Sequence, residues 1–201
     1  MVEKSDNPYR HLPAKAFWRT GVAEAGLFGL SGLWSSAWTL PADAQFATFG
    51  SCFAQHISRA LISRKMNWLN AEPAPGRTPP ELAQKYNYGV FSARTGNIYT
   101  AAQLLIWARL ASGAIGADSV EYWTDGDGLV HDMLRPKIEP QGFVSRKEAE
   151  ASVASTARAF ARCITEADVL VFTLGLTEGW INTATGQSYS ICPGTGVGTF
   201  D

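Results

Sequence analysis

Cysteine and histidine are scarce in this sequence, with three residues of each among 201. Cys52, Cys163 and Cys192 are odd in number and widely spaced, which argues against a disulfide framework. The sequence also lacks a C-x-x-C pair and paired histidines, the usual donors of a zinc site. We therefore expect no metal and no cofactor, and a reducing, cytoplasmic environment.

Long hydrophobic runs and an excess of charge are also missing. No stretch of about 18 apolar residues indicates a membrane span, and the polar N-terminus lacks the hydrophobic region of a secretory signal. A net charge of −1 gives no reason to expect nucleic acid or a membrane surface as a partner. A hydrophobic content of 46% against 17% charged residues is ordinary for a globular protein with a real core.

The length fits one α/β domain preceded by an N-terminal arm. Residues 1–40 are rich in aromatic residues and glycine but show little periodicity. Because so much tryptophan would be costly in a free tail, we expect an arm packed on the domain, with a short helix near residues 13–19. The domain itself is expected over residues 41–201.

The most informative stretch joins a predicted strand, Phe46–Phe49, to a predicted helix. The strand is a short apolar run, and apolar residues at i, i+4 and i+8 from Phe53 indicate the helix. Ser51 lies at the junction, where its hydroxyl can cap the helix and free backbone N–H groups can receive negative charge. This serine is either a simple N-cap or a nucleophile, and Cys52 is a rival nucleophile. The G-x-S-x-G elbow of α/β-hydrolases is absent.

A second polar turn follows a second apolar run. Residues 169–173, Val-Leu-Val-Phe-Thr, predict a strand covered on both faces. The turn over residues 174–180 comes directly after it, at the carboxyl end of that strand. Since ligands of open α/β sheets bind at this edge, we expect this turn and the turn that contains Ser51 to share one edge of one sheet.

Capping residues predict two further helices. Thr100 is the expected cap of a helix over residues 100–111. Ser145 and Glu148 form a capping box that starts a long helix ending near Ala167. The apolar face expected of this long helix consists of Val153, Ala157, Phe160 and Ile164.

Turn residues predict a surface loop and a hairpin. Four prolines over residues 70–80 indicate the loop. Residues 119–123 and 129–134 flank the turn Asp125–Gly128, a pattern typical of a β-hairpin. The alternative for this acidic turn is a calcium loop, which is less favoured because the third carboxylate position and the distal glutamate are missing.

Gly50-Ser51-Cys52-Phe53-Ala54 spells the motif after which the GSCFA family is named. The chain resembles this family, a branch of the SGNH (GDSL-like) hydrolase superfamily, over nearly its whole length. Further segments are similar to the family's other blocks and follow in the same order: Phe17-Trp18-Arg19, Tyr86-Asn87, Asp132-Met-Leu-Arg135-Pro136, Thr173-Leu-Gly-Leu-Thr-Glu178 and Cys192-Pro-Gly194.

The resemblance implies a three-layer α/β/α sandwich with a flavodoxin-like parallel sheet and Ser51 as the nucleophile. Gly175, Thr177 and Glu178 lie in the block where other SGNH enzymes carry Gly-x-Asn-Asp. Thr177 therefore takes the position of the oxyanion-hole asparagine. A hydroxyl is a single rotatable donor and is less preorganised than an amide.

The remaining oxyanion donors are expected to be the backbone N–H of Ser51 and a group from Asn87 or Gly89. The general base is missing, because SGNH enzymes carry it in an Asp-x-x-His block near the C-terminus and this sequence has no such block. His56 lies nearly a turn and a half beyond Ser51 on the predicted helix and is expected to point away from it. His131 and the aspartate next to it lie on a strand, where neighbours face opposite sides.

Family members continue past this endpoint, so we expect the chain to be the N-terminal part of such a protein, with an unpaired sheet edge through which it could self-associate. The expected function is that of an SGNH-type serine ester hydrolase or O-acyltransferase, for example for acetyl groups, acting on a small ester or an acylated glycan. The alternatives are an inactive glycan- or ligand-binding module on the same fold, an inactive fragment, and a thiol enzyme that uses Cys52.

Overall fold

The structure is a computed structural model that describes residues 7–195 and residue 198. The chain divides into two compact units, residues 1–41 and residues 42–201. In the first unit, the helix predicted near residues 13–19 is replaced by two short turns, the 3-10 turn η1 (Ala14–Ala16) and the π turn η2 (Arg19–Ala23). Neither turn has a side-chain cap at its start, and Gly21 lies inside the second, so a regular helix is not favoured there.

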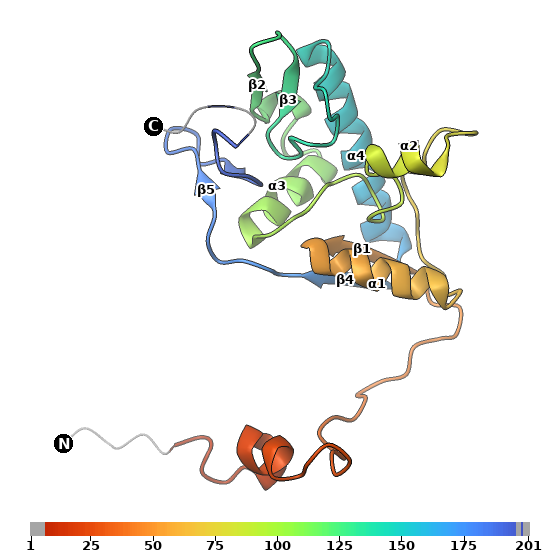
Figure 1. The fold of residues 1–201 in the computed structure, drawn as a ribbon, viewed down its shortest axis with the longest axis vertical. Coiled ribbons are helices and arrows are strands. Elements are labelled where there is room, and N and C mark those ends of the chain that lie inside the picture. The colour runs from red at the N-terminus through yellow and green to blue at the C-terminus, as the bar shows by residue number, and fades with distance from the viewer. Residues whose placement is uncertain (1–6, 196–197, 199–201) are drawn as a thin grey trace, which may run out of the picture. The chain divides into compact units, whose positions relative to one another are not determined.

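The second unit is a mixed α/β domain (Figure 1). Its helices are α1 (Cys52–Ser63), α2 (Pro80–Lys85), α3 (Ala101–Ala111) and α4 (Arg146–Glu166), with a 3-10 turn η3 (Ala117–Ser119). Its strands are β1 (Phe46–Gly50), β2 (Tyr122–Thr124), β3 (Val130–Asp132), β4 (Val169–Thr173), β5 (Trp180–Ile181) and β6 (Ser188–Tyr189). β1 pairs with β4 in parallel, whereas β2–β3 and β5–β6 are antiparallel pairs.

The predicted α/β class is confirmed, with a parallel sheet of two strands in the part of the chain that the structure describes. Helices contact both faces of β1. Thr48 bonds to Ser58 of α1 through their hydroxyls at 2.7 Å, and the ring of Phe49 lies 4.7 Å from that of Phe160 on α4. Because neighbouring residues of a strand face opposite sides, α1 and α4 lie against opposite faces of β1.

Two predictions about which side chains are buried around this sheet are wrong. β4 was predicted to be covered on both faces, but Leu170 is 47% exposed, whereas every residue of its partner β1 is buried. On α1, Phe53 of the predicted apolar face is 62% exposed, and the buried residues are Ala54 and Ser58. Small residues allow the helix to approach the sheet closely, and the hydroxyl bond to Thr48 satisfies the buried Ser58.

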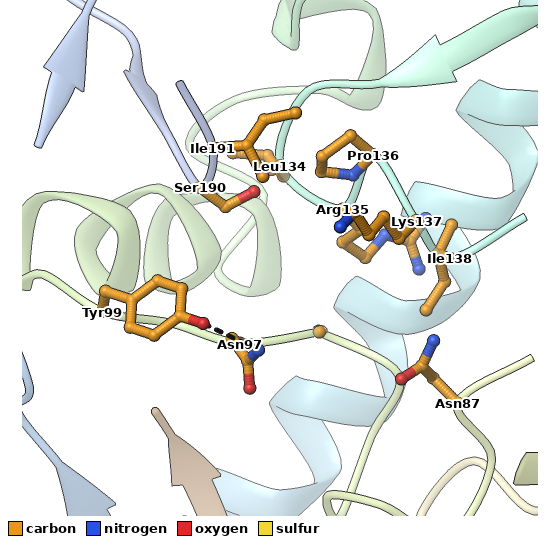
Figure 2. Close-up of a pocket in the computed structure, with 11 residues that line it drawn as sticks. Asn87, Asn97, Tyr99, Leu134, Arg135, Pro136, Lys137, Ile138, Ser190 and Ile191 are labelled. Carbon is orange, nitrogen blue, oxygen red and sulfur yellow. Dashed lines mark hydrogen bonds between the residues drawn. The ribbon is translucent and has the colours of Figure 1, made fainter. Parts of the chain in front are cut away.

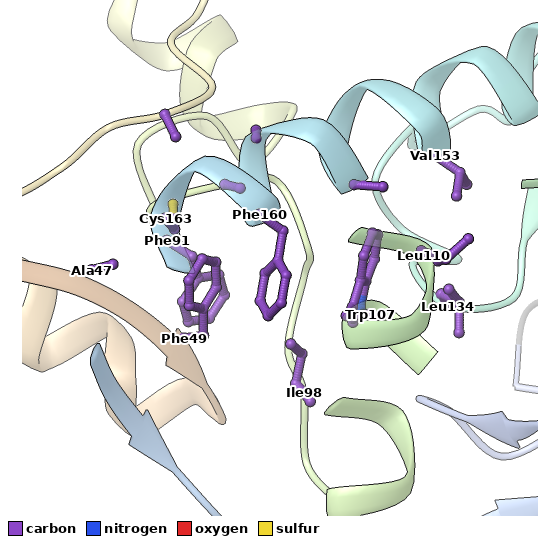
Figure 3. Close-up of a cluster of buried hydrophobic side chains, with 14 of the residues drawn as sticks. Ala47, Phe49, Phe91, Ile98, Trp107, Leu110, Leu134, Val153, Phe160 and Cys163 are labelled. Carbon is purple, nitrogen blue, oxygen red and sulfur yellow. The ribbon is translucent and has the colours of Figure 1, made fainter. Parts of the chain in front are cut away.

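The core lies between β1, α3 and α4, where aromatic side chains from all three elements meet (Figure 3). Phe160 contacts both Phe49 and Trp107, with ring centroids 4.7 and 6.3 Å apart. Val153, Ala157 and Phe160 are buried as predicted, but Ile164 is half exposed and Cys163 takes its place. With 3.6 residues per turn, Ile164 lies on the same side of the helix as Val153 and Phe160, so the exposure of Ile164 depends on which neighbours cover the last turn and not on the helical period. Burial raises the pKa of the Cys163 thiol to about 12.

Both predicted helix caps are confirmed. Thr100 forms a reciprocal capping box with Gln103 at the start of α3. The Ser145 hydroxyl accepts from the backbone N–H of Glu148 at 3.2 Å, but the Glu148 carboxylate accepts from the N–H of Val144 and not from that of Ser145, so the predicted capping box is not reciprocal. No helix in residues 7–195 is long and apolar enough to cross a membrane.

The loop and the hairpin also form where they were predicted. The loop over residues 70–80 ends in α2, which begins at Pro80, a residue favoured at the first helical position. β2 and β3 form the hairpin. Asp125 closes its turn, because its carboxylate accepts from the backbone N–H groups of Asp127 and Leu129.

Candidate functional site

Ser51 lies where β1 ends and α1 begins. The parallel register pairs Gly50 of β1 with Thr173 of β4, so the two strands end at the same edge. Gly50 has a φ of +128°, and a Cβ there would lie 2.4 to 2.7 Å from atoms of Thr173. Only glycine fits this position, and it lets the chain turn sharply before Ser51.

Ser51 is the N-cap of α1, so the structural role weighed from its sequence position is confirmed. Its hydroxyl accepts from the backbone N–H of Phe53 at 3.3 Å and shares a hydrogen bond with the Thr173 hydroxyl at 3.1 Å. Its backbone N–H donates to Thr173 Oγ1 at 3.0 Å. The residue is 8% exposed, whereas the neighbouring Cys52 is exposed, so the two adjacent side chains have different surroundings.

The turn after β4 packs directly on Ser51. A Cβ on Gly175 would lie 3.0 Å from Ser51 Cβ and 3.5 Å from Ser51 Oγ. The prediction that the two polar turns share one edge of the sheet is therefore confirmed. Thr177 and Glu178 follow in the same turn and are exposed.

A third segment, residues 97–99, completes this edge and was not singled out by the sequence. The N–H of Ile98 donates to the carbonyl of Gly50 at 2.8 Å. The Asn97 amide donates to the Tyr99 hydroxyl at 2.9 Å and accepts from Gln55 of α1 at 3.2 Å. Its one sequence signal is its position directly before the predicted cap of α3.

Tyr99 connects this segment to the turn after β4. Its carbonyl accepts from the N–H groups of Gly175 and Leu176, at 3.2 and 3.0 Å. Burial and the nearby Cys52 raise the pKa of the Tyr99 phenol above its ordinary 10.0, although the hydrogen bond with Asn97 lowers it. The phenol is therefore neutral at pH 7 and can donate as well as accept.

Tyr99 lines two cavities. The first encloses about 300 Å³ and is lined by polar groups that include Asn87, Asn97, Lys137 and Ser190 (Figure 2). The second encloses about 440 Å³ and is lined by residues that include Leu176, Glu178 and Trp180.

The predicted site residues thus fall into three places. Ser51 and Gly175 are in contact at the sheet edge. Asn87 lines the first cavity and Glu178 the second. Gly89 and Thr177 line neither of these two cavities. The N–H of Ser51, an expected oxyanion donor, already bonds to Thr173, and the N–H of Gly175 bonds to the Tyr99 carbonyl.

Neither His56 nor His131 takes part in these hydrogen bonds. His56 is exposed on α1. His131 pairs with Asp125 across the hairpin turn at 2.9 Å, while Asp132 bonds to Arg135 at 2.6 Å. Sequence reasoning considered only the neighbouring Asp132 as a partner for His131. No cluster of three or more His, Cys, Asp or Glu that could hold a metal occurs in residues 7–195 and 198.

The comparisons with known proteins identify a family but no individual relative. No curated protein and no solved structure matches the chain. The sequence matches the GSCFA family over residues 45–201, a range that includes β1, the turn after β4 and every residue placed at the sheet edge. Because this match takes in most of the chain, the protein belongs to the GSCFA family.

Proposed function

We propose that the protein is an SGNH-type serine ester hydrolase or O-acyltransferase that uses Ser51 as its nucleophile on a small ester or an acylated glycan. The observation that carries the proposal is the contact between Ser51 and Gly175 at the carboxyl edge of a parallel sheet. Open α/β sheets bind ligands at this edge. We further propose that β1, β4 and the helices against them belong to the three-layer α/β/α sandwich of that superfamily.

In the proposed reaction, Ser51 Oγ attacks the carbonyl carbon of the ester and loses its proton to a general base. The new carbon–oxygen bond gives a tetrahedral intermediate, which collapses to an acyl-enzyme as the alcohol leaves with a proton. Water then attacks the acyl-enzyme in a hydrolase, and a second alcohol does so in a transferase. Either attack releases the acyl group and returns the proton to Ser51.

We assign oxyanion stabilisation to the turn over residues 175–177. Thr177 is exposed there, and the N–H of Gly175 becomes available if it leaves the Tyr99 carbonyl when an ester binds. Asn87 is assigned to substrate binding, since it lines the first cavity. Losing a fixed oxyanion donor lowers turnover by roughly 10²–10³-fold, and a rotatable hydroxyl replaces such a donor only in part.

The general base is the component that the described residues do not bring to Ser51. The bonds to its hydroxyl come from Thr173 and Phe53, and a threonine hydroxyl is not a base near neutral pH. Without a base the serine retains only residual reactivity. The chain by itself is therefore expected to hydrolyse esters slowly.

A fluorophosphonate label tests the nucleophile even when turnover is slow, because the label reacts once and stays attached. The label is expected on Ser51 by peptide mass spectrometry, and Ser51→Ala is expected to abolish both labelling and p-nitrophenyl acetate hydrolysis. Cys52→Ala should retain both, since the thiol is the rival nucleophile.

Loss of the cap needs its own control. Ser51→Ala removes an N-cap and is expected to cost about 0.5–2 kcal/mol of stability. Ser145→Ala removes the equivalent cap of α4 at a similar cost, so it should lower the melting temperature but keep the labelling. If the folded chain hydrolyses the ester but Ser51 carries no label, the proposal is contradicted.

A second candidate function is a binding module for glycans or similar ligands without catalysis. It is favoured by one observation, that the Ser51 hydroxyl already serves as a helix cap bonded to Thr173. Glycan titration of the unmodified chain separates the two candidates. Binding without any labelling of Ser51 favours the module, and labelling of Ser51 favours the enzyme.

A further inference from the structure

The two cavities share one wall. Tyr99, Ser190 and Ile191 line both of them. Ser190 Oγ is buried and has no hydrogen-bond partner among the described residues. Buried hydroxyls in folded proteins nearly always have a partner, so the wall that the two cavities share contains an unsatisfied polar group.

The first cavity has the chemistry of a carbohydrate site. The amides of Asn87 and Asn97 offer donors and acceptors, and the Tyr99 hydroxyl lies at 2.9 Å from Asn97 (Figure 2). Lys137 adds an ammonium group. Arg135 also lines the cavity, but its side chain is fully buried and bonds to Asp132, so it fixes the wall rather than a ligand.

The second cavity offers a large apolar surface beside its polar residues, which include Thr100 and Gln103. Leu176 and Trp180 line it and are 51% and 41% exposed, and Ile191 contributes from the shared wall. Glu178 lines the same cavity. A carboxylate at this place repels a negatively charged acyl group, so the surface suits a short neutral acyl chain.

Ser51 and Gly175 line neither cavity, but Gly175 lies beside Tyr99, which lines both. A Cβ on Gly175 would lie 3.0 Å from Ser51 Cβ and 3.9 Å from the Tyr99 ring. Leu176, the residue after Gly175, lines the second cavity. Asn97, two residues before Tyr99, lines the first cavity. Gly175 and Tyr99 therefore link the surroundings of Ser51 to the lining of both cavities.

We propose that Tyr99 separates two subsites for the substrate. The carbohydrate moiety binds in the cavity of Asn97 and Lys137, and a short neutral acyl group binds in the cavity of Leu176 and Trp180. This assignment rests on the proposed function for its placement around Ser51. It adds the class of ligand that each side of the site accepts. A neutral acyl group and a hydroxyl-rich acceptor are the two parts of an acylated glycan.

The test measures binding by saturation-transfer NMR to the full chain carrying Ser51→Ala, which cannot form an acyl-enzyme. The probes are methyl glucoside and methyl butyrate. In this background Asn97→Ala and Lys137→Ala are each expected to weaken glucoside binding about threefold to tenfold and to leave butyrate binding unchanged. Trp180→Ala is expected to weaken butyrate binding by a similar factor and to leave glucoside binding unchanged.

Lys147→Ala on the exposed side of α4 is the matched control for Lys137→Ala, because Lys147 lines neither cavity. Lys137 is itself exposed, so its variant is expected to fold even if Asn97→Ala does not. Competition between the two probes, equal losses in all variants, or no saturation transfer to either probe overturns the assignment. Absence of esterase activity with the expected binding pattern would remove the enzyme proposal and keep the two subsites.

Discussion

The backbone N–H of Ser51 donates to Thr173 Oγ1 at 3.0 Å, and the two hydroxyls lie 3.1 Å apart. The residues are 122 positions apart in the sequence and meet because β1 and β4 end in register. Thr173 therefore fixes both the start of α1 and the orientation of the Ser51 hydroxyl. A single threonine links the fold of this edge to the reactivity proposed for it.

Thr173→Val tests this link, since valine keeps the branched shape but removes the hydroxyl. The Ser51 N–H loses its shorter hydrogen bond, and we expect a loss of about 1–3 kcal/mol in the free energy of unfolding, measured by urea denaturation. Thr173→Ser keeps the hydroxyl and should recover most of that loss. Equal stability of the Val variant and the unmodified chain would show that the bond contributes nothing.

Gly50→Ala is expected to be among the most destabilising single changes in the domain. A Cβ there would lie 2.4 to 2.7 Å from Thr173 atoms at a φ of +128°. Since both the contacts and the backbone angle are unfavourable, we expect a loss of about 3 kcal/mol or more, seen as a lower melting temperature. Gly76→Ala is the matched control, because a Cβ at Gly76 meets nothing within 4 Å. Similar melting temperatures for the two variants would contradict the prediction.

Local patterns were enough to predict the elements around Ser51. A short apolar run followed by Gly-Ser gave β1 and the cap of α1, and Thr100 and Ser145 gave two more helix starts. Each of these signals depends on residues within a few positions of one another. For the same reason the shared edge of the two turns could be predicted, because it needed only the ends of two strands.

Contacts between distant segments could not be predicted in this way. Asn97 and Tyr99 join the candidate site through hydrogen bonds to Gln55 and Gly175, and no local pattern marks those pairings. The side of each element that is buried was also mistaken at Ile164 and Leu170, because that side depends on which neighbours cover it.

The Asp132–Arg135 pair gives a prediction about the core. Both side chains are fully buried, and Arg135 also donates to the Arg94 carbonyl, Thr156 and Ser152. Arg135→Leu leaves the Asp132 carboxylate buried and unpaired, so we expect a loss of about 3–5 kcal/mol. Adding Asp132→Leu removes that charge and should recover part of the loss in urea denaturation. A double variant less stable than Arg135→Leu would argue against this explanation.

Glu121 gives a prediction about pH. Burial alone would raise the pKa of its carboxyl, but hydrogen bonds from Thr185, Tyr189 and Asn182, with a contribution from Trp123, outweigh burial and lower that pKa below its ordinary 4.5. The Tyr189 hydroxyl donates at 2.5 Å and the Asn182 amide at 2.9 Å. Glu121 thereby ties the β5–β6 hairpin, which ends next to the second cavity, to the start of β2.

A carboxyl whose pKa is lower in the folded state than in the unfolded state stabilises the fold above the unfolded value, and this stabilisation is lost as the pH falls through the folded value. Glu121→Gln should therefore lower the melting temperature at pH 7, and its difference from the unmodified chain should shrink as the pH falls below 4.5. The pKa of Tyr189 is raised to about 12 by burial and by Glu121, so its phenol remains a donor throughout this range. Lys147→Ala is a control that should show no such pH dependence. A melting difference for Glu121→Gln that stays constant from pH 7 to acid would show that the charge of Glu121 does not hold the hairpin.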